Sequence, residues 1–214
     1  MKKSIAVLGL GKFGQSLVRT LNEMGADVLA ADHNEAIVKE IAANCSEAVC
    51  ADLTNEESLM ALGLKDMDIV VVAVGRNLEA SFYAVSVAKE QGVPLIVAKS
   101  TSSRMTSILR KLGADKVIMP EESSGSRVAV ILASESVLDY FRVDEDLCMV
   151  EMKPHSDWAG RSVIDLDMRR KYKINVVAAK DADGKWRMID PEEPLKEERE
   201  LLVILDRKDL GMIR

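Results

Sequence analysis

Short apolar runs alternate with amphipathic segments along the first two-thirds of the chain. Apolar runs bounded by turn residues predict strands at residues 4–8, 27–31, 48–50, 68–74, 94–99 and 116–119. Apolar positions three or four residues apart predict helices at 15–24, 35–43, 56–62, 78–91 and 104–112. Strands and helices that alternate in this way form a parallel sheet with right-handed crossovers. The pattern therefore predicts an α/β fold with a doubly wound parallel sheet.

Two helix ends carry additional local signals. Gly25 stands where a helix C-terminal cap belongs, because glycine readily adopts the left-handed conformation of such a cap. Thr54 and Glu57 have the spacing of a capping box, which fits the start of the helix predicted at 56–62.

The pattern changes in the last third of the chain. Residues 123–140 predict one long helix, and the charged residues 142–146 predict a linker. The apolar stripe of this helix, interrupted by Glu135, consists of Val128, Ile131, Leu132 and Leu138. Such a stripe needs a partner surface, and two interpretations remain open. The helix is an exchange arm between two protomers, or it is an ordinary final helix on the sheet.

The remaining residues predict a small mixed α+β domain. Its predicted elements are strands at 147–153, 175–180, 186–189 and 201–205, a helix at 162–172 and a hairpin turn at Asp183-Gly184. A domain of this size buries little core, so we expect it to dimerise and to hold a second ligand between subunits. The predicted organisation is a first domain at 1–122, a crossover helix and linker at 123–143, and a second domain at 144–214.

A glycine-rich loop follows the first predicted strand. Gly9-Leu10-Gly11-Lys12-Phe13-Gly14 has the form G-x-G-x-x-G and opens a helix. Gly9 permits the tight turn, Gly11 lets the backbone approach a diphosphate, and Gly14 lets the helix pack close to the sheet. The helix N-terminus then offers unpaired N–H groups to the phosphates. This arrangement predicts a Rossmann-like nucleotide site, although a glycine turn without a ligand has the same sequence.

Three charged residues extend the predicted site. Asp32 ends the second strand, where a carboxylate accepts hydrogen bonds from ribose hydroxyls. The following His33-Asn34-Glu35 contains no Arg or Lys for a 2′-phosphate. NADP is therefore disfavoured. Asp52, after the third strand, either accepts from the adenine amine or caps a turn. Lys12 serves the diphosphate, reaches a third phosphate, or is a solvated lysine at the helix start.

Composition narrows the class of function. The net charge is −6 and the pI about 5.1, which argues against a nucleic-acid partner. Cys45, Cys50 and Cys148 form no disulfide or zinc pattern, and they indicate a reducing cytoplasm. The apolar runs are too short for a membrane span or a signal peptide. No Tyr-x-x-x-Lys pair, nucleophile elbow or Walker loop accompanies the glycine motif, so we infer a binding module without catalytic residues.

Several of these segments together resemble the regulator-of-conductance-of-potassium (RCK) family, specifically the cytoplasmic Ktr/Trk-type potassium uptake regulators. The resemblance covers the whole chain. It is carried by residues 5–14, Asp32, Ala51-Asp52, and residues 71–75, 96–99, 113–121 and 164–177. With the motif residues, it places the nucleotide at Gly9, Leu10, Gly11, Lys12, Phe13, Gly14, Asp32, His33, Asp52, Leu53, Ala73, Val74, Gly75, Lys99 and Glu121.

The resemblance implies a specific function. ATP, ADP or NAD(H) at the glycine loop would set the shape of a ring of homodimers, an octamer, under a membrane potassium transporter of the TrkH or KtrB type. The protein would be cytoplasmic, peripheral at the inner face of the plasma membrane. Lys12 would reach the terminal phosphates across the dimer, and Glu121 would lie near them or near a divalent or sodium ion. Arg169, Asn175 and Val176 match a region where some members bind cyclic di-AMP.

Two departures from the family pattern and two alternative functions stay open. Lys12 replaces the usual arginine, and Arg199-Glu200 replaces the usual Gly-Asp near the last strand. The first alternative is a small NAD-dependent oxidoreductase with a substrate site between subunits. The second is a redox-sensing DNA regulator, which the acidic pI and the lack of a helix-turn-helix disfavour.

Overall fold

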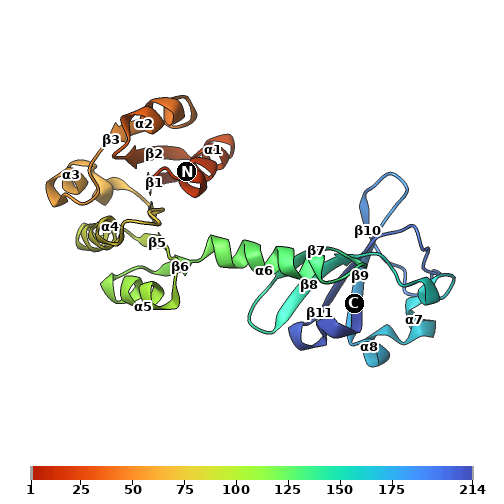
Figure 1. Cartoon of the computed structure of the whole chain (residues 1–214). Coiled ribbons are helices and arrows are strands. Elements are labelled where there is room, and N and C mark those ends of the chain that lie inside the picture. The colour runs from red at the N-terminus through yellow and green to blue at the C-terminus, as the bar shows by residue number, and fades with distance from the viewer. Residues whose placement is uncertain (1, 214) are drawn as a thin grey trace. The chain divides into compact units, whose positions relative to one another are not determined.

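The computed structural model describes residues 2–213, and these residues divide into two compact units with the boundary between Pro120 and Glu121 (Figure 1). The first unit contains a six-stranded parallel sheet with the order β3-β2-β1-β4-β5-β6. Its strands are β1 (Ser4–Leu8), β2 (Asp27–Asp32), β3 (Glu47–Cys50), β4 (Ile69–Val72), β5 (Leu95–Lys99) and β6 (Lys116–Ile118). This is the doubly wound α/β sheet that the alternating pattern predicts.

Helices cover both faces of the parallel sheet (Figure 1). They are α1 (Lys12–Glu23), α2 (Glu35–Ile41), α3 (Glu56–Ala61), α4 (Leu78–Glu90) and α5 (Ser103–Leu112). Val18 and Val38 from α1 and α2 pack with one side of β1, whereas Leu59 and Leu109 from α3 and α5 belong to the core on its other side. Both faces of the strands are therefore buried, which explains their nearly continuous apolar sequence.

The strand order reverses beside β1. β1 pairs with β2 on one side and with β4 on the other, both in parallel. The chain therefore leaves β1 and β4 in opposite directions across the sheet, and a crevice opens between their carboxyl ends. The glycine loop follows β1, so the fold brings it to this crevice.

The second unit is a five-stranded antiparallel sheet with short helices. The order is β10-β9-β11-β8-β7. The strands are β7 (Val137–Arg142), β8 (Leu147–Met152), β9 (Ile174–Lys180), β10 (Trp186–Met188) and β11 (Leu201–Asp206). Trp158 and Leu166 are fully buried against the sheet with Met152 and Val203, so this unit has a core of its own.

The long helix predicted at 123–140 is wrong in its second half. Helix α6 spans Pro120–Leu132, and Val137–Arg142 is strand β7, which pairs with β8. Helical spacing and strand alternation look alike over a few apolar residues, and here pairing with β8 buries Val137 and Tyr140. Of the stripe, Ile131 packs on the core of the second unit, whereas Val128 and Leu132 are exposed.

The linker predicted at 142–146 is also wrong, because these residues close the β7–β8 hairpin. Asp144 Oδ1 accepts hydrogen bonds from the N–H groups of Asp146 and Leu147, at 2.8 and 2.7 Å. These charged residues thus form a turn, in which the Asp144 side chain accepts hydrogen bonds from backbone N–H groups.

Two further local predictions need correction. The helix predicted at 162–172 is divided into α7 (Val163–Leu166) and α8 (Met168–Lys171), because Asp167 has a φ of 48°. Asn55, not Thr54, caps α3 by accepting from the Ser58 N–H at 2.9 Å. Gly25 does adopt the left-handed conformation expected after α1, with φ at 80°.

Candidate functional site

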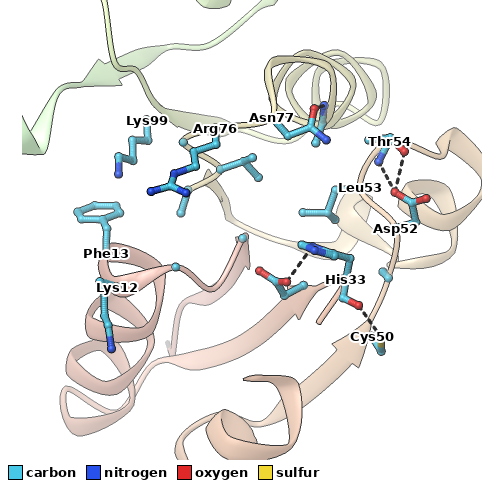
Figure 2. A pocket seen from close by; sticks show the side chains of 18 residues that line it. Lys12, Phe13, His33, Cys50, Asp52, Leu53, Thr54, Arg76, Asn77 and Lys99 are labelled. Atoms are coloured by element: carbon cyan, nitrogen blue, oxygen red, sulfur yellow. Dashed lines mark hydrogen bonds and ion pairs between the residues drawn. The ribbon is translucent and has the colours of Figure 1, made fainter. Parts of the chain in front are cut away.

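A cavity of about 920 Å³ lies at the carboxyl ends of the parallel strands, within the first unit (Figure 2). The loops that follow β1, β2, β3 and β4, together with the end of β5, contribute to its walls. The lining residues are Gly9, Gly11, Lys12, Phe13, Asp32, His33, Cys50, Ala51, Asp52, Leu53, Thr54, Ala73, Val74, Gly75, Arg76, Asn77, Ala80 and Lys99. Its volume is within the range of small-molecule sites, and its place is the crevice beside β1.

The three glycines of the loop differ in what requires them. Gly9 has a φ of 99°, and a Cβ on Gly14 would lie 2.0 Å from the Gly9 carbonyl oxygen. The packing of the protein itself therefore excludes a side chain at both positions. A Cβ on Gly11 would meet no protein atom within 4 Å. Gly11 lines the cavity, so a side chain there would project into open space beside the cavity wall.

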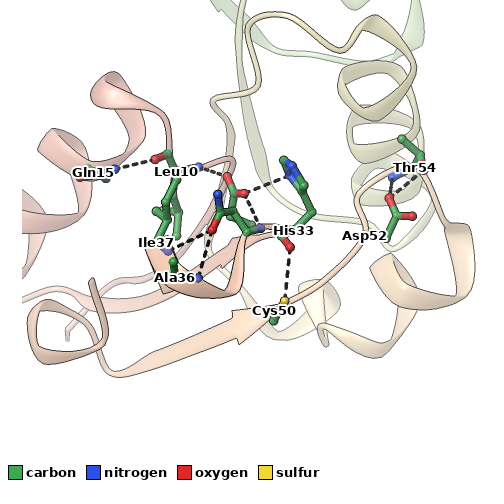
Figure 3. A network of polar contacts seen from close by, with 10 residues as sticks. Leu10, Gln15, His33, Ala36, Ile37, Cys50, Asp52 and Thr54 are labelled. Atoms are coloured by element: carbon green, nitrogen blue, oxygen red, sulfur yellow. Dashed lines mark hydrogen bonds and ion pairs between the residues drawn. The ribbon is translucent and has the colours of Figure 1, made fainter. Parts of the chain in front are cut away.

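Asp32, the last residue of β2, belongs to a network of polar contacts that includes Leu10 and His33, both labelled in Figure 3. Its Oδ2 accepts from the Leu10 N–H at 2.6 Å, and its Oδ1 accepts from the Asn34 N–H at 2.9 Å. His33 Nδ1 lies 3.0 Å from Oδ1, and Asp32 is only 7% exposed. Because a carboxylate has about four acceptor positions, Asp32 joins the glycine loop to β2 and keeps capacity for another donor.

Asp52 organises the turn after β3. Its Oδ1 accepts from the N–H and the hydroxyl of Thr54, at 2.9 and 2.7 Å. Both hydrogen bonds lower the pKa of the Asp52 carboxyl below its ordinary value, and the bond from the Thr54 hydroxyl has the larger effect. The turn-capping role of Asp52 is thus present in the structure, and its place in the cavity wall leaves the adenine-contact role a prediction.

Cations gather at the other side of the cavity. Lys99 is 8% exposed, and its ammonium group lies 5.8 Å from the centroid of the Phe13 ring. A Cβ on Gly75 would lie 3.5 Å from Lys99 Nζ, so the loop after β4 passes close to this lysine. In Figure 2, Arg76 lies beside Lys99 and Phe13, whereas the Lys12 side chain points away from them.

Most of the predicted nucleotide residues lie together in the cavity wall. Leu10, Gly14 and Glu121 are the predicted residues outside it. Leu10 is buried and binds Asp32 through its N–H, and Gly14 provides close packing in α1. Glu121 lies in the first turn of α6 and belongs to the second unit.

Sequence reasoning missed several wall residues. These are Cys50, Ala51, Thr54, Arg76, Asn77 and Ala80. Arg76 and Asn77 lie in the loop between β4 and α4, a few residues after the buried run of β4. The rule that ligands bind at the carboxyl ends of parallel strands, applied to every strand rather than to the motif alone, would have included them.

The residues of the second predicted site lie at α8 and the start of β9. Arg169 Nε donates a hydrogen bond to Asn175 Oδ1 at 2.5 Å, and Val176 is half-buried beside Asn175. Their role toward a ligand remains a prediction. Among residues 2–213 there is no group of three or more His, Cys, Asp or Glu side chains placed to hold a metal ion. In the same range, no helix is long and apolar enough to cross a membrane.

The fold and the cavity define a Rossmann-type protein with a nucleotide-site geometry and a second α+β domain. Comparison with family models matches the TrkA-N domain at residues 5–120 and the TrkA-C domain at residues 147–214. The chain therefore belongs to the TrkA family of potassium uptake proteins, as the resemblance indicated.

Named relatives agree with this assignment. The Ktr system potassium uptake protein C of Bacillus subtilis is 41% identical over 213 residues, with 99% of this chain and 96% of the relative covered. The Ktr system potassium uptake protein A of the same organism is 35% identical, with 97% of this chain and 94% of the relative covered. Protein A of Vibrio alginolyticus is 37% identical, with 83% and 81% covered.

Solved structures share the fold. The GsuK channel bound to NAD matches with a TM-score of 0.67 at 16% identity, over 100% of this chain and 39% of the channel chain. The GsuK RCK domain matches with a TM-score of 0.66 at 15% identity, over 99% of this chain and 47% of the RCK chain. This chain thus spans less than half of each structure, and at such identity the likeness concerns the fold alone.

Proposed function

We propose that this chain is the nucleotide-sensing regulatory subunit of a membrane potassium transporter. It binds an adenine nucleotide, ATP/ADP or NAD(H), in the cavity beside β1 and thereby controls potassium uptake. The family membership supports the transport role, because the named relatives are components of potassium uptake systems.

One observation carries the nucleotide part of the proposal. Gly11 faces cavity space that no protein atom occupies, although Gly9 and Gly14 are required by the protein itself. The backbone N–H groups at the start of α1 border that space, and the N-terminus of a helix favours an anion. A diphosphate lying over Gly11 accounts for the one glycine of the loop that the protein's own packing does not require.

The charges of the cavity wall indicate how the ligand lies. Asp32 ends β2 and Asp52 follows β3, whereas Arg76 lies in the loop after β4 and Lys99 ends β5. The sheet order therefore places acids on one side of the crevice and cations on the other. The ribose and adenine belong on the acidic side, and the phosphates extend across the glycine loop.

The proposed action is regulation by differential binding. A ligand shifts an equilibrium between two shapes only as far as it binds one shape more tightly than the other. The walls of the cavity hold no Tyr-x-x-x-Lys pair or nucleophile elbow, and the histidine there, His33, contacts Asp32 on the ribose side. We therefore propose a protein that binds the nucleotide and does not transform it.

The assembly and the second ligand follow from the family and remain proposals. We propose a cytoplasmic ring of homodimers, an octamer, that docks at the inner face of the plasma membrane on a subunit of the TrkH or KtrB type. Lys12 and Glu121 would act at the terminal phosphates, with a divalent or sodium ion near Glu121. Arg169, Asn175 and Val176 would contact cyclic di-AMP.

The first experiment identifies the ligand. Mass spectrometry of nucleotides released from the purified chain, followed by calorimetry with ATP, ADP, NADH and NAD⁺, should find an adenine nucleotide. Small-angle scattering of the full chain should change when that nucleotide is added. A scattering profile that no nucleotide alters would refute gating by this route.

The second experiment separates regulation from catalysis. Potassium uptake by vesicles that contain the transporter subunit should depend on the nucleotide when this chain is present. Incubation with nucleotide alone should leave the nucleotide intact. Steady oxidation of NADH or hydrolysis of ATP would instead favour an enzyme, the oxidoreductase with an intersubunit substrate site included.

A further inference from the structure

Arg76 is a cation of the cavity wall to which neither the glycine motif nor the family resemblance assigns a role. It directly precedes Asn77, the N-cap of α4, whose side chain accepts from the Ala80 N–H at 3.1 Å. The Arg76 side chain is exposed and lines the cavity. Within residues 2–213 it has no hydrogen-bond or ion-pair partner. Its guanidinium group is thus available to a ligand.

The position of Arg76 indicates which part of a bound nucleotide it would contact. β4 lies next to β1 on the side opposite β2 and Asp32. In Figure 2, Arg76 lies on the side of Lys99 and Phe13, away from His33 and Asp52. A nucleotide with its ribose at Asp32 and its diphosphate over Gly11 would extend toward Arg76. The group that reaches Arg76 is therefore the one beyond the first phosphates.

Two kinds of group could arrive there. In ATP or ADP it is a terminal phosphate with its negative charge, and a guanidinium binds phosphate oxygens through paired hydrogen bonds. In NAD⁺ it is a nicotinamide riboside whose ring carries a positive charge. The adjacent cations Arg76 and Lys99 attract the first group and repel the second.

We propose that Arg76 is a specificity-determining residue that binds the terminal phosphate of ADP or ATP and disfavours NAD⁺. This inference rests on the proposed function and narrows it to adenosine di- and triphosphates. Lys99, buried beside Arg76, holds a second positive charge close to the same phosphate.

Calorimetry on the full-length chain tests the inference with ATP, ADP, AMP and NAD⁺. The variants are R76Q, which removes the charge, R76K, which keeps it without the paired donors, and R110Q as a matched control. Arg110 is exposed on α5 and lies outside the cavity wall. Thermal melts of the unliganded variants verify that each one folds.

The loss of affinity that R76Q causes should grow with the number of phosphates in the ligand. R76Q should raise the Kd for ATP about tenfold or more, as expected for a lost charged hydrogen bond. The Kd for AMP should change by less than about threefold, and the Kd for NAD⁺ should fall, because R76Q removes a charge that repels the nicotinamide ring. R76K should lie between R76Q and the unchanged chain, and R110Q should match the unchanged chain.

Two results would overturn the inference alone. If R76Q left ATP binding unchanged, Arg76 would not contact phosphate, and if R76Q weakened all four ligands equally, Arg76 would only support the wall. An unchanged chain that bound none of the four ligands would instead overturn the proposed function.

Discussion

At the scale of single residues, the three glycines of the loop are constrained by different things. Gly14 is required because a Cβ would lie 2.0 Å from the Gly9 carbonyl oxygen, whereas Gly11 faces open space. The same substitution at the two positions should therefore have separate effects, one on folding and one on binding.

Gly11→Ala and Gly14→Ala form a matched pair of variants. We expect Gly11→Ala to melt close to the unchanged chain and to lose nucleotide affinity by about tenfold or more, because its Cβ enters the diphosphate space. Gly14→Ala should lose about 1–3 kcal/mol of stability from overpacking. Thermal melts and calorimetry measure the two effects. Normal nucleotide binding by a well-folded Gly11→Ala variant would contradict the site.

The cysteines provide a second test at this scale. Cys50 is exposed in the cavity wall, where its thiol lies 3.5 Å from the His33 carbonyl oxygen. Burial raises the pKa of the Cys45 thiol, and raises that of Cys148 to about 11. Because the thiolate is the reactive form, Cys50 should react first with a thiol reagent.

Bound nucleotide should slow this reaction. A saturating adenine nucleotide should reduce the labelling rate of Cys50, followed by peptide mass spectrometry, and leave that of Cys45 unchanged. The variant Cys50→Ser shows which part of the signal belongs to Cys50. Equal rates at Cys50 with and without nucleotide would place the ligand elsewhere.

At the scale of elements, Asp167 determines where one predicted helix becomes two. Its φ of 48° lies in the left-handed region, which costs about 1–2 kcal/mol for most residues with a Cβ. α7 ends before it and α8 begins after it. Nothing in the apolar spacing of 162–172 reveals this break.

Asp167→Gly and Asp167→Ala test the break. The glycine variant should be more stable than the alanine variant by about 1 kcal/mol, because glycine adopts a positive φ without strain. Chemical denaturation measures the difference. Thr20, which is exposed within α1, provides the control. There the alanine variant should be more stable than the glycine variant by about 1 kcal/mol, because glycine destabilises a helix interior. An alanine advantage at position 167 would mean that the helix is continuous.

At the scale of the whole molecule, the two units have separate cores. The apolar clusters of the parallel sheet contain residues of the first unit only, and Trp158, Leu166 and Met168 belong to the cluster of the second unit. The nucleotide cavity lies within the first unit. Ligand binding should therefore stabilise the two units unequally.

Calorimetric unfolding of the full chain should show this difference. At a nucleotide concentration of 100 times Kd, the first unit gains about 2.7 kcal/mol, and its transition should rise in temperature. The transition of the second unit should rise less, since the cavity wall includes none of its residues and Glu121 is the one contact proposed from that unit. Arg76→Gln should reduce the rise with ATP and not with AMP. Equal shifts of both transitions would indicate a ligand that the units share.

The sequence by itself determined the parallel sheet, the glycine turn and the place of Asp32. Each depends on local rules: buried strands read as apolar runs, Gly9 needs a positive φ, and an acid that ends β2 lies at the same sheet edge as the loop after β1. The family assignment followed from the same segments and is confirmed by the matched domains.

Only the tertiary structure decided the rest. Residues 137–142 became a strand because β8 offers them a ladder and a buried face, which helical spacing cannot reveal. Arg76 entered the site because the strand order places the end of β4 beside the end of β1, although the two are far apart in the chain. Local patterns determine which element a segment forms when its periodicity is clear, and long-range packing determines which loops meet.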